Sequence, residues 1–293
     1  MKGKQLTIPL TIILSILWIY PVWCDDARSI MQQVLDRNDG TTEISRVRLS
    51  SCTMAKSGGK LKCTETPRVK VMDMVRKDYG PREKDHKTVT IILEPAGEKG
   101  IGFLQYDYEQ KGKDTDQWLY LSALGKVKRI VSGNEDEPKT GSFFGTEFSY
   151  EDMESIHLED YTYKILGSEV YQNSDCWVVE SIPVMSRARK SNYSKVMDWV
   201  DKKRFIVLKS VLFNRQGKKF KKIYYRKIDT IDDILVPRQI IVFNIQTRRR
   251  TVLSYENIRL NRPVQDDFLT QRTLTDGAFR EMNLKGYQQN LVD

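Results

Sequence analysis

The sequence predicts a mainly β protein in which one antiparallel sheet curls upon itself. Apolar runs of strand length follow one another and are separated by short turn signals rich in Gly, Pro, Asn and Asp. These runs cover residues 42–54, 61–76, 86–94, 100–108, 117–121, 126–131, 161–171, 175–184, 195–200, 205–213, 218–229, 237–246 and 250–259. Neither a βαβ alternation nor a repeat of fixed period interrupts these hairpins. A curled antiparallel sheet is therefore favoured over an α/β fold.

Side-chain alternation indicates which strands have one polar face. Val89 and Ile91 share a face of their strand, whereas Thr88 and Thr90 lie on the other. Other runs, such as 205–213, are apolar on both faces. Those strands require cover on both sides of the sheet.

The first 24 residues have the layout of a secretory signal peptide. Lys2 and Lys4 precede an uncharged run that extends to Trp23, and Val22 and Cys24 are suitably placed before a cleavage site. An uncleaved anchor is one alternative, because the run approaches the length of a membrane-spanning helix. Acylation of Cys24 is another, which Trp23 disfavours because a small residue is wanted at that position.

Cleavage after Cys24 leaves residues 25–293, which we expect to form a single domain in the periplasm. The sequence has 48 basic and 39 acidic residues, a net charge of +9, and loss of Lys2 and Lys4 lowers this to +7. In a cytoplasmic protein this balance would suggest nucleic acid as a partner. Export instead favours anionic membrane surfaces or lipid headgroups, with no nucleic-acid partner.

An amphipathic helix is predicted at residues 27–36. Asp25 and Asp26 are suited to cap its N-terminus, and Asn38-Asp39-Gly40 ends it. The apolar stripe of this helix consists of Ala27, Ile30, Met31, Val34 and Leu35. Such a stripe is typical of a helix that covers an apolar face of a sheet.

Aromatic side chains and glycines are concentrated between residues 116 and 153. Two strands, 117–121 and 126–131, form a predicted hairpin around Gly125, with Trp118 and Tyr120 on one strand face. The segment that follows places large rings beside glycines that allow a close approach of backbone or ligand. Its members are Gly141, Phe143, Phe144, Gly145, Phe148 and Tyr150. They include no catalytic group.

These residues closely resemble a signature of the bacterial outer-membrane lipoprotein-sorting (LolA-like) family. The family pattern is W-x-Y-L-P-A-L-G followed by G-S-F-x-G-[ST]-[DE]-[FL]-[ST]-Y-E-D. The matching residues are Trp118, Tyr120, Leu121, Ala123, Leu124, Gly125, Gly141, Ser142, Phe143, Gly145, Thr146, Glu147, Phe148, Ser149, Tyr150, Glu151 and Asp152. Ser122 replaces the usual proline. The likeness extends over nearly all of the mature chain.

The resemblance implies an α+β fold, a half-open β-barrel whose concave apolar face is covered by helices. We expect the N-terminal helix and the strand of Trp118 and Tyr120 to meet across this interior. The expected ligand-binding residues are Ile30, Val34, Trp118, Tyr120, Leu124, Phe143, Phe144, Phe148 and Tyr150. The alternative for each aromatic ring is a place in the packed core.

Cys52 and Cys63 are suited to form a disulfide in an oxidising compartment. If Ser57 and Gly58 are the two central residues of a hairpin turn, Cys52 lies opposite Cys63. The alternative is two free, buried thiols in a shifted register. Relatives in the family typically lack this pair, which implies a local staple without functional meaning. Cys176 is interpreted as a small buried hydrophobic residue.

The sequence contains no recognisable catalytic or metal-binding pattern. Its histidines are His86 and His157, which lack metal-ligand spacing. No nucleophile elbow, phosphate-binding loop or dinucleotide fingerprint is present. The acidic clusters 135–137 and 232–233 lie at turn-like positions and are interpreted as solvated loop charges. We therefore expect no enzyme activity, metal or cofactor.

Basic residues are concentrated in one late strand and one cluster beyond it. They are Lys218, Lys219, Lys221, Lys222, Arg226 and Lys227, followed by Arg248, Arg249 and Arg250. Alternation prevents the strand lysines from sharing one surface. They indicate an edge or solvent-facing strand protected by charge. Docking to an anionic lipid or an acidic partner is the functional alternative.

The resemblance and the apolar strands together predict a carrier or chaperone. Its apolar half-barrel cavity would shield acyl chains of lipoproteins or lipids and deliver them toward the outer membrane. An inner-membrane exporter and an outer-membrane acceptor would be its partners. The alternatives are a cell-envelope interaction or scaffold module, and an accessory lipid-binding protein of a membrane exporter.

The first testable prediction concerns export. We expect a mature N-terminus at Asp25, because the charged start, the apolar run and the Val22/Cys24 pair form a cleavable signal. N-terminal sequencing of the protein from the envelope fraction tests this. Recovery of Met1, or of a lipid-modified Cys24, would contradict the prediction.

Overall fold

The computed structural model describes residues 26–132 and 137–292. The predicted signal peptide and Asp25 lie outside the described residues, as do Glu135 and Asp136 of one acidic cluster.

Strands account for most of the described chain. They are β1 (Thr42–Ser57), β2 (Lys60–Cys63), β3 (Arg68–Tyr79), β4 (Asp85–Glu94), β5 (Gly102–Asp107), β6 (Asp116–Leu121), β7 (Lys126–Ile130), β8 (Tyr161–Tyr171), β9 (Ser174–Pro183), β10 (Tyr193–Asp201), β11 (Val207–Asn214), β12 (Lys219–Ile231), β13 (Ile234–Asn244) and β14 (Arg249–Leu260). The α-helices are α1 (Ala27–Leu35), α2 (Met185–Lys190), α3 (Gln271–Thr275) and α4 (Gly277–Val292). Short 3-10 helices are η1 (Ala96–Glu98), η2 (Ser122–Leu124), η3 (Phe143–Gly145), η4 (Glu151–Met153), η5 (Leu158–Asp160) and η6 (Asp266–Leu269).

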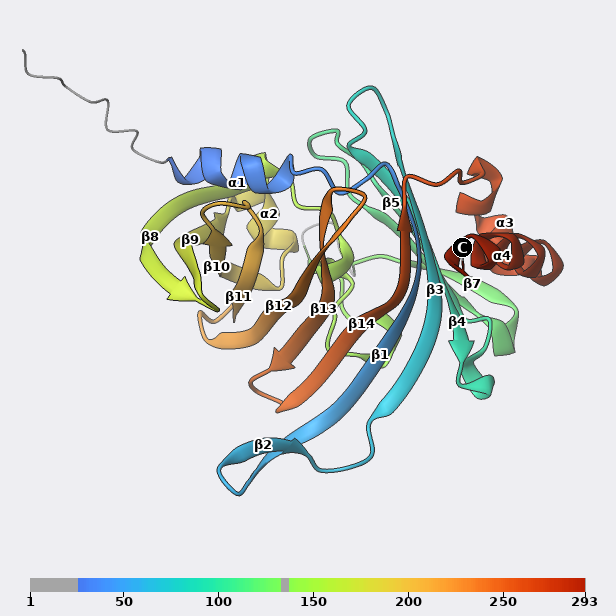
Figure 1. Cartoon of the computed structure of the whole chain (residues 1–293), viewed down its shortest axis with the longest axis horizontal. Coiled ribbons are helices and arrows are strands. Elements are labelled where there is room, and N and C mark those ends of the chain that lie inside the picture. The colour runs from blue at the N-terminus through green and yellow to red at the C-terminus, as the bar shows by residue number, and fades with distance from the viewer. Residues whose placement is uncertain (1–25, 133–136, 293) are drawn as a thin grey trace, which may run out of the picture.

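The strands form one antiparallel sheet that curls without closing (Figure 1). Its order is β7-β6-β5-β4-β3-β1-β14-β13-β12-β11-β10-β9-β8, and β2 pairs only with β1. The end strands β7 and β8 lie far apart in this order and do not pair. Contacts between β1 and β14 join the two halves of the chain. The predicted curled, half-open barrel is therefore confirmed.

Residues 141–153, here called the inner segment, fill the concave face of the sheet. Phe143, Phe148 and Tyr150 from this segment are buried against strand residues such as Phe103 and Leu253. Gly141 has a φ of 113°, and a Cβ added there would lie 2.8 Å from Cε2 of Tyr150. Glycine is therefore required for the inner segment to enter with this tyrosine ring packed against it.

A buried ion pair fixes the inner segment to the sheet. The Lys221 Nζ of β12 lies 2.7 Å from the Asp152 Oδ2, and both side chains are 4% exposed. Tyr193 of β10 donates a hydrogen bond of 2.6 Å to the other oxygen of Asp152. The prediction that the basic run marks an edge or solvent-facing strand is wrong at Lys221, because β12 pairs on both sides and turns this lysine inward.

The C-terminal segment covers the convex face of β1 and β3–β6. Phe268, Leu269 and Leu274 are fully buried there against strand residues such as Leu104. Gly102 permits close packing, since a Cβ at this position would lie 2.8 Å from Cδ2 of Leu274. Neither α3 nor α4 is predicted by the sequence pattern. Apolar and polar residues are mixed around α4, so its sequence shows no marked amphipathic stripe.

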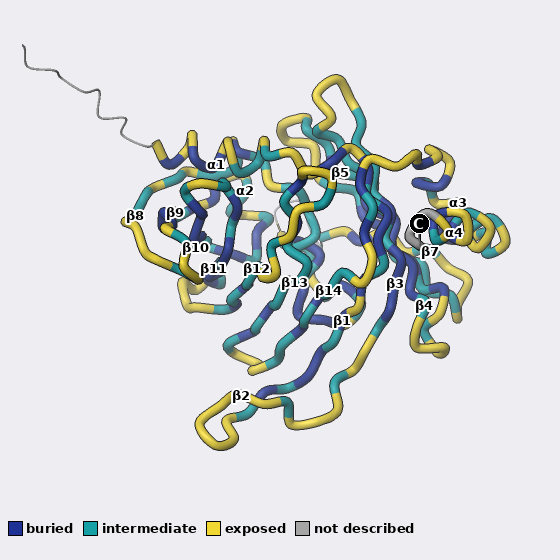
Figure 2. The backbone as a smooth tube through the Cα atoms, viewed as in Figure 1, coloured by how far each residue is buried: buried dark blue, intermediate teal, exposed yellow. Residues whose placement is uncertain are grey.

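Trp118 and Tyr120 pack against this hydrophobic cluster on the convex face, whereas Leu119 packs against the cluster on the concave face. The N-terminal helix α1 lies elsewhere, over β8–β10 (Figures 1 and 2). The prediction that α1 and the strand of Trp118 meet across a shared interior is therefore wrong. Alternation places Trp118 on the face opposite to the concave side, where the C-terminal helices provide its cover.

The helix α1 covers the concave face at the other end of the sheet. Asp26 caps it by accepting a hydrogen bond of 3.3 Å from the Arg28 backbone N–H. Ile30 and Met31 are buried against Trp177 and other residues of β9 and β10. The predicted amphipathic helix is present and ends at Leu35, one residue earlier than the expected range of 27–36.

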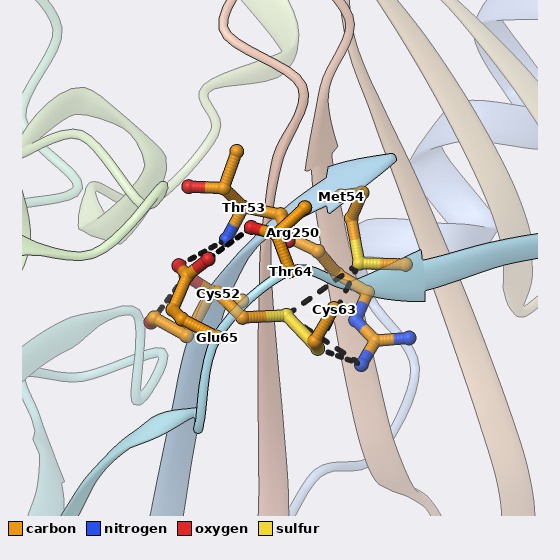
Figure 3. The surroundings of a disulfide bond; sticks show 9 residues. Cys52, Thr53, Met54, Cys63, Thr64, Glu65 and Arg250 are labelled. Atoms are coloured by element: carbon orange, nitrogen blue, oxygen red, sulfur yellow. Dashed lines mark hydrogen bonds between the residues drawn. A yellow bond between two sulfur atoms is a disulfide. The ribbon is translucent and has the colours of Figure 1, made fainter. Parts of the chain in front are cut away.

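Cys52 and Cys63 are joined by a disulfide with a Cα–Cα distance of 5.7 Å (Figure 3). The register differs from the expected one, because β1 pairs Ser57 with Lys60 and Met54 with Cys63. Gly58 and Gly59, which both have positive φ, are therefore the central turn residues. The bond joins diagonal neighbours of the hairpin instead of an opposite pair. Cys176 is buried and free.

The second prediction concerns this disulfide. Replacing both Cys52 and Cys63 by serine should lower the free energy of unfolding by roughly 2–3 kcal/mol, because the bond closes a short loop of the unfolded chain. Urea unfolding of the oxidised wild type and the double variant measures the difference. The Cys176→Ala variant is a control: reducing agent should lower its free energy of unfolding by as much as it does for the wild type. Equal stability of oxidised wild type and double variant would contradict the prediction.

The third prediction concerns the buried ion pair. Lys221→Met should destabilise the fold by about 3–5 kcal/mol, because Asp152 then remains as a buried charge without its counter-ion. Lys219→Met on the same strand is the matched control, since Lys219 is exposed. Its expected cost is below about 1 kcal/mol. Chemical unfolding of the two variants checks this difference, and similar costs would refute the structural role of the pair.

Candidate functional site

A cavity of about 180 Å³ lies on the concave side, beneath α1. Its floor is the inner face of β8–β12, and residues 151–161 form one wall. The apolar part of its lining includes Met31, Val34, Leu35, Val196, Leu212 and Ile223. This is the place where the concave face is left partly unfilled by the inner segment.

The register of the strands explains why these side chains converge. Val196 of β10 lies opposite Leu212 of β11, and the next pair on the same face of the sheet is Asp198 and Ser210. Ser210 in turn lies opposite Ile223 of β12. Because opposite residues of paired strands point to the same face, the row lies on the concave side beneath α1.

A second buried charge network closes the wall beside the inner segment. The Arg187 Nη2 of α2 lies 2.9 Å from the Glu151 Oε1, and Arg187 also pairs with Glu154. Ser191 donates a hydrogen bond of 2.5 Å to Glu151, and Asn192 donates to it through its backbone N–H at 2.7 Å. Burial raises the pKa of Glu151, and the Arg187 charge opposes that shift. The carboxylate is thus fully bonded within the protein.

Asp198 is the carboxylate of the cavity floor. It lies in the middle of β10 and is 8% exposed. Burial raises its pKa to about 6, while a hydrogen bond of 2.5 Å donated by the Ser210 hydroxyl to Oδ1 opposes the shift. A single neutral donor is weak compensation for a buried charge.

The expected ligand-binding residues separate into several groups. Val34 lines the cavity, and Ile30 is packed against β9 beside it. Phe143, Phe148 and Tyr150 belong to the inner core cluster. The Phe103 ring lies 5.2 Å from Phe143 and 5.9 Å from Tyr150, measured between centroids.

The remaining expected residues lie away from the cavity. Phe144 packs beside the inner core and borders a separate hollow with Thr146 and Arg249. Trp118 and Tyr120 lie on the outer face, and the Leu124 side chain is 64% exposed. The family resemblance therefore identified the inner segment, of which Glu151 and Asp152 reach the cavity, whereas half of the cavity lining comes from strands β8–β12. The alternation of side chains along those strands could have revealed the lining residues. It was hard to interpret because several of these strands are apolar on both faces.

His86 and the acidic pair Asp232 and Asp233 were also singled out in the sequence, and they lie away from the cavity. The Nδ1 of His86 lies 2.7 Å from the Asp78 Oδ1. Asp232 and Asp233 form the exposed turn between β12 and β13, with φ of 48° and 62°. Within residues 26–132 and 137–292, no group of His, Cys, Asp and Glu is arranged to hold a metal ion. None of the helices that the structure describes has the length and apolarity needed to cross a membrane.

Comparisons with known proteins place the fold among lipoprotein-sorting proteins. A family model described as "uncharacterized protein" matches residues 84–276. A DUF1329 family protein from Desulfovibrio piger has 24% identity and a TM-score of 0.73 over 85% of this chain and 96% of its own. A domain from Vibrio parahaemolyticus assigned to outer membrane lipoprotein sorting has 25% identity and a TM-score of 0.73 over 85% and 98%.

A LolA superfamily protein from Nitrosomonas europaea is similar at 21% identity, with a TM-score of 0.58 over 83% of this chain and 97% of its own. No curated protein matches the sequence. The family model spans about two thirds of the chain, and the structural neighbours share its half-open barrel. The chain therefore belongs to the family whose model matches residues 84–276, and its open curled sheet is the fold of the LolA-like proteins that its residues 118–152 resemble.

Proposed function

We propose that the protein is a periplasmic carrier that shields acyl chains of lipoproteins or lipids and delivers them toward the outer membrane. The observation that carries this proposal is the partly apolar cavity between α1 and the concave face of β8–β12. The mechanism is reversible burial and needs no catalytic group. The name of one structural neighbour, the lipoprotein-sorting domain from Vibrio parahaemolyticus, supports the same function.

Burial of hydrocarbon supplies the binding energy. Each methylene removed from water contributes about 0.8 kcal/mol, so even part of an acyl chain is held by apolar walls. The cavity of about 180 Å³ is smaller than ordinary ligand pockets. A long chain would therefore enter by displacing α1, whose Met31, Val34 and Leu35 already cover the cavity.

The same proposal identifies the type of partner. A carrier between two membranes receives cargo from an inner-membrane exporter and gives it to an outer-membrane acceptor. The net positive charge of the sequence favours an approach to anionic membrane surfaces. The signal-peptide layout of residues 1–24 is the basis for placing the protein in the periplasm.

A cell-envelope scaffold is the second candidate function. The observation that favours it is the inner segment, whose buried aromatic residues fill the centre of the half-barrel. A scaffold would use its outer surface and would bind no acyl chain. An accessory lipid-binding protein of an exporter would use the same cavity as a carrier, so acyl binding separates the scaffold from both.

The fourth prediction tests acyl binding directly. The lipid-stripped protein should bind a fluorescent fatty-acid analogue saturably, and Val34→Asp should weaken the affinity at least about tenfold, because the new carboxylate faces an apolar wall. Val170→Asp is the matched control, since Val170 is 76% exposed. Native mass spectrometry of protein from its own envelope would identify a copurified lipid. If the folded wild type binds no acyl analogue saturably, the carrier proposal is wrong and the scaffold should replace it.

A further inference from the structure

Three polar side chains lie together on the floor of the cavity beneath α1. Tyr163 of β8 and Ser181 of β9 are directly opposite each other, and Ser181 is also opposite Val196 of β10. Asp198 follows Val196 by two residues and therefore points to the same face. Ser181 and Asp198 are thus diagonal neighbours, separated by about 7–8 Å between backbones, whereas Tyr163 lies two strands, about 10 Å, from the strand of Asp198 and can approach it only through its long side chain. All three side chains line the cavity.

Two of these side chains have unsatisfied hydroxyl groups. Among the residues that the structure describes, four buried side-chain polar atoms lack a hydrogen-bond partner: Thr90 Oγ1, Tyr163 Oη, Ser181 Oγ and Arg250 Nε. The tyrosine and serine hydroxyls line the same cavity. Ser181 is only 4% exposed. Buried polar groups are nearly always paired with protein groups or ordered water, so these two hydroxyls are free to bond with whatever occupies the cavity.

Asp198 complements the two hydroxyls. Its Oδ1 accepts from Ser210, which leaves the second oxygen able to accept from a ligand. Three other carboxylates of the cavity wall are engaged elsewhere: Glu151 and Glu154 pair with Arg187, and Asp152 pairs with Lys221. Asp160 also lines the wall, outside the floor strands. The floor thus offers two hydroxyl donors beside one carboxylate acceptor.

We propose that Ser181, Tyr163 and Asp198 bind a secondary amide at the head of an acyl chain. The amide carbonyl oxygen accepts from the Ser181 and Tyr163 hydroxyls, and the amide N–H donates to Asp198. This subsite rests on the proposed carrier function and adds the chemical class of the cargo. The hydrocarbon chain extends from the subsite along Val196, Leu212 and Val34.

The arrangement discriminates against other acyl headgroups. An ester offers the carbonyl acceptor but has no proton for Asp198, so one charge-assisted hydrogen bond is lost. A free fatty acid brings a second carboxylate next to Asp198 in a poorly solvated site, where like charges repel. The expected order of affinity is therefore amide, then ester, then carboxylate.

The fifth prediction is this order of affinity. Lipid-stripped protein is titrated at about pH 8, above the pKa of about 6 for Asp198. Displacement of a fluorescent acyl probe is measured with the N-methylamide, the methyl ester and the carboxylate of one fatty acid. We expect the amide to bind about tenfold more tightly than the ester, and the carboxylate to bind most weakly.

Variants assign this selectivity to the named residues. Ser181→Ala and Tyr163→Phe should each lower amide affinity about five- to tenfold, because each removes one donor. Asp198→Asn should remove the penalty against the carboxylate. Thr90→Val is the matched control, since Thr90 also has an orphaned buried hydroxyl but lies outside the cavity. It should leave all three affinities unchanged.

An N-acylated peptide distinguishes two sources of the amide. If both the peptide and the small amide bind, the subsite is supported and protein-linked chains are assigned as cargo. Binding of the small amide alone supports the subsite with small lipid amides as cargo.

The outcomes that overturn the subsite are distinct from those that overturn the carrier. If the three headgroups bind the wild type equally, or if Thr90→Val reduces amide binding as much as Ser181→Ala, the subsite is wrong while the carrier proposal stands. If no acyl compound binds the folded wild type, both proposals fail.

Discussion

The structure depends on covering both faces of one open, strongly curled sheet. A sheet that closes into a barrel hides its inner face, whereas this one ends at β7 and β8 and leaves that face accessible. The inner segment covers the middle of the concave face and α1 covers the end near β8–β10. The C-terminal helices cover the convex side. The cavity lies where two of these covers meet.

Buried charges hold the inner segment in position. Asp152 and Glu151 are adjacent in sequence, yet they bind different partners, Lys221 on β12 and Arg187 on α2. Each carboxylate is also hydrogen-bonded by neighbouring groups, which offsets the cost of removing it from water. The acidic pair of the family signature therefore fixes the boundary between the packed interior and the cavity.

Much of the fold, but little of the cavity, could be predicted from the sequence. Strand boundaries and α1 follow from local periodicity and turn residues, which act over short distances. The face that a strand presents depends on sheet register and on distant covers, so Trp118 was assigned to the wrong side and α4 was missed. Lys221 was interpreted as a surface charge because its partner, Asp152, is 69 residues away. The unpaired hydroxyl of Ser181 depends on packing across several strands.

The way α1 is held determines what controls access to the cavity. Its ion pairs, Arg28 with Glu159 and Asp36 with Lys84, are solvent-exposed and contribute little. Burial of Ala27, Ile30 and Met31 provides most of the attachment. Hydrophobic attraction weakens on cooling and is insensitive to charge screening by dilute salt. Displacement of α1 from the cavity therefore becomes easier on cooling and depends little on ionic strength.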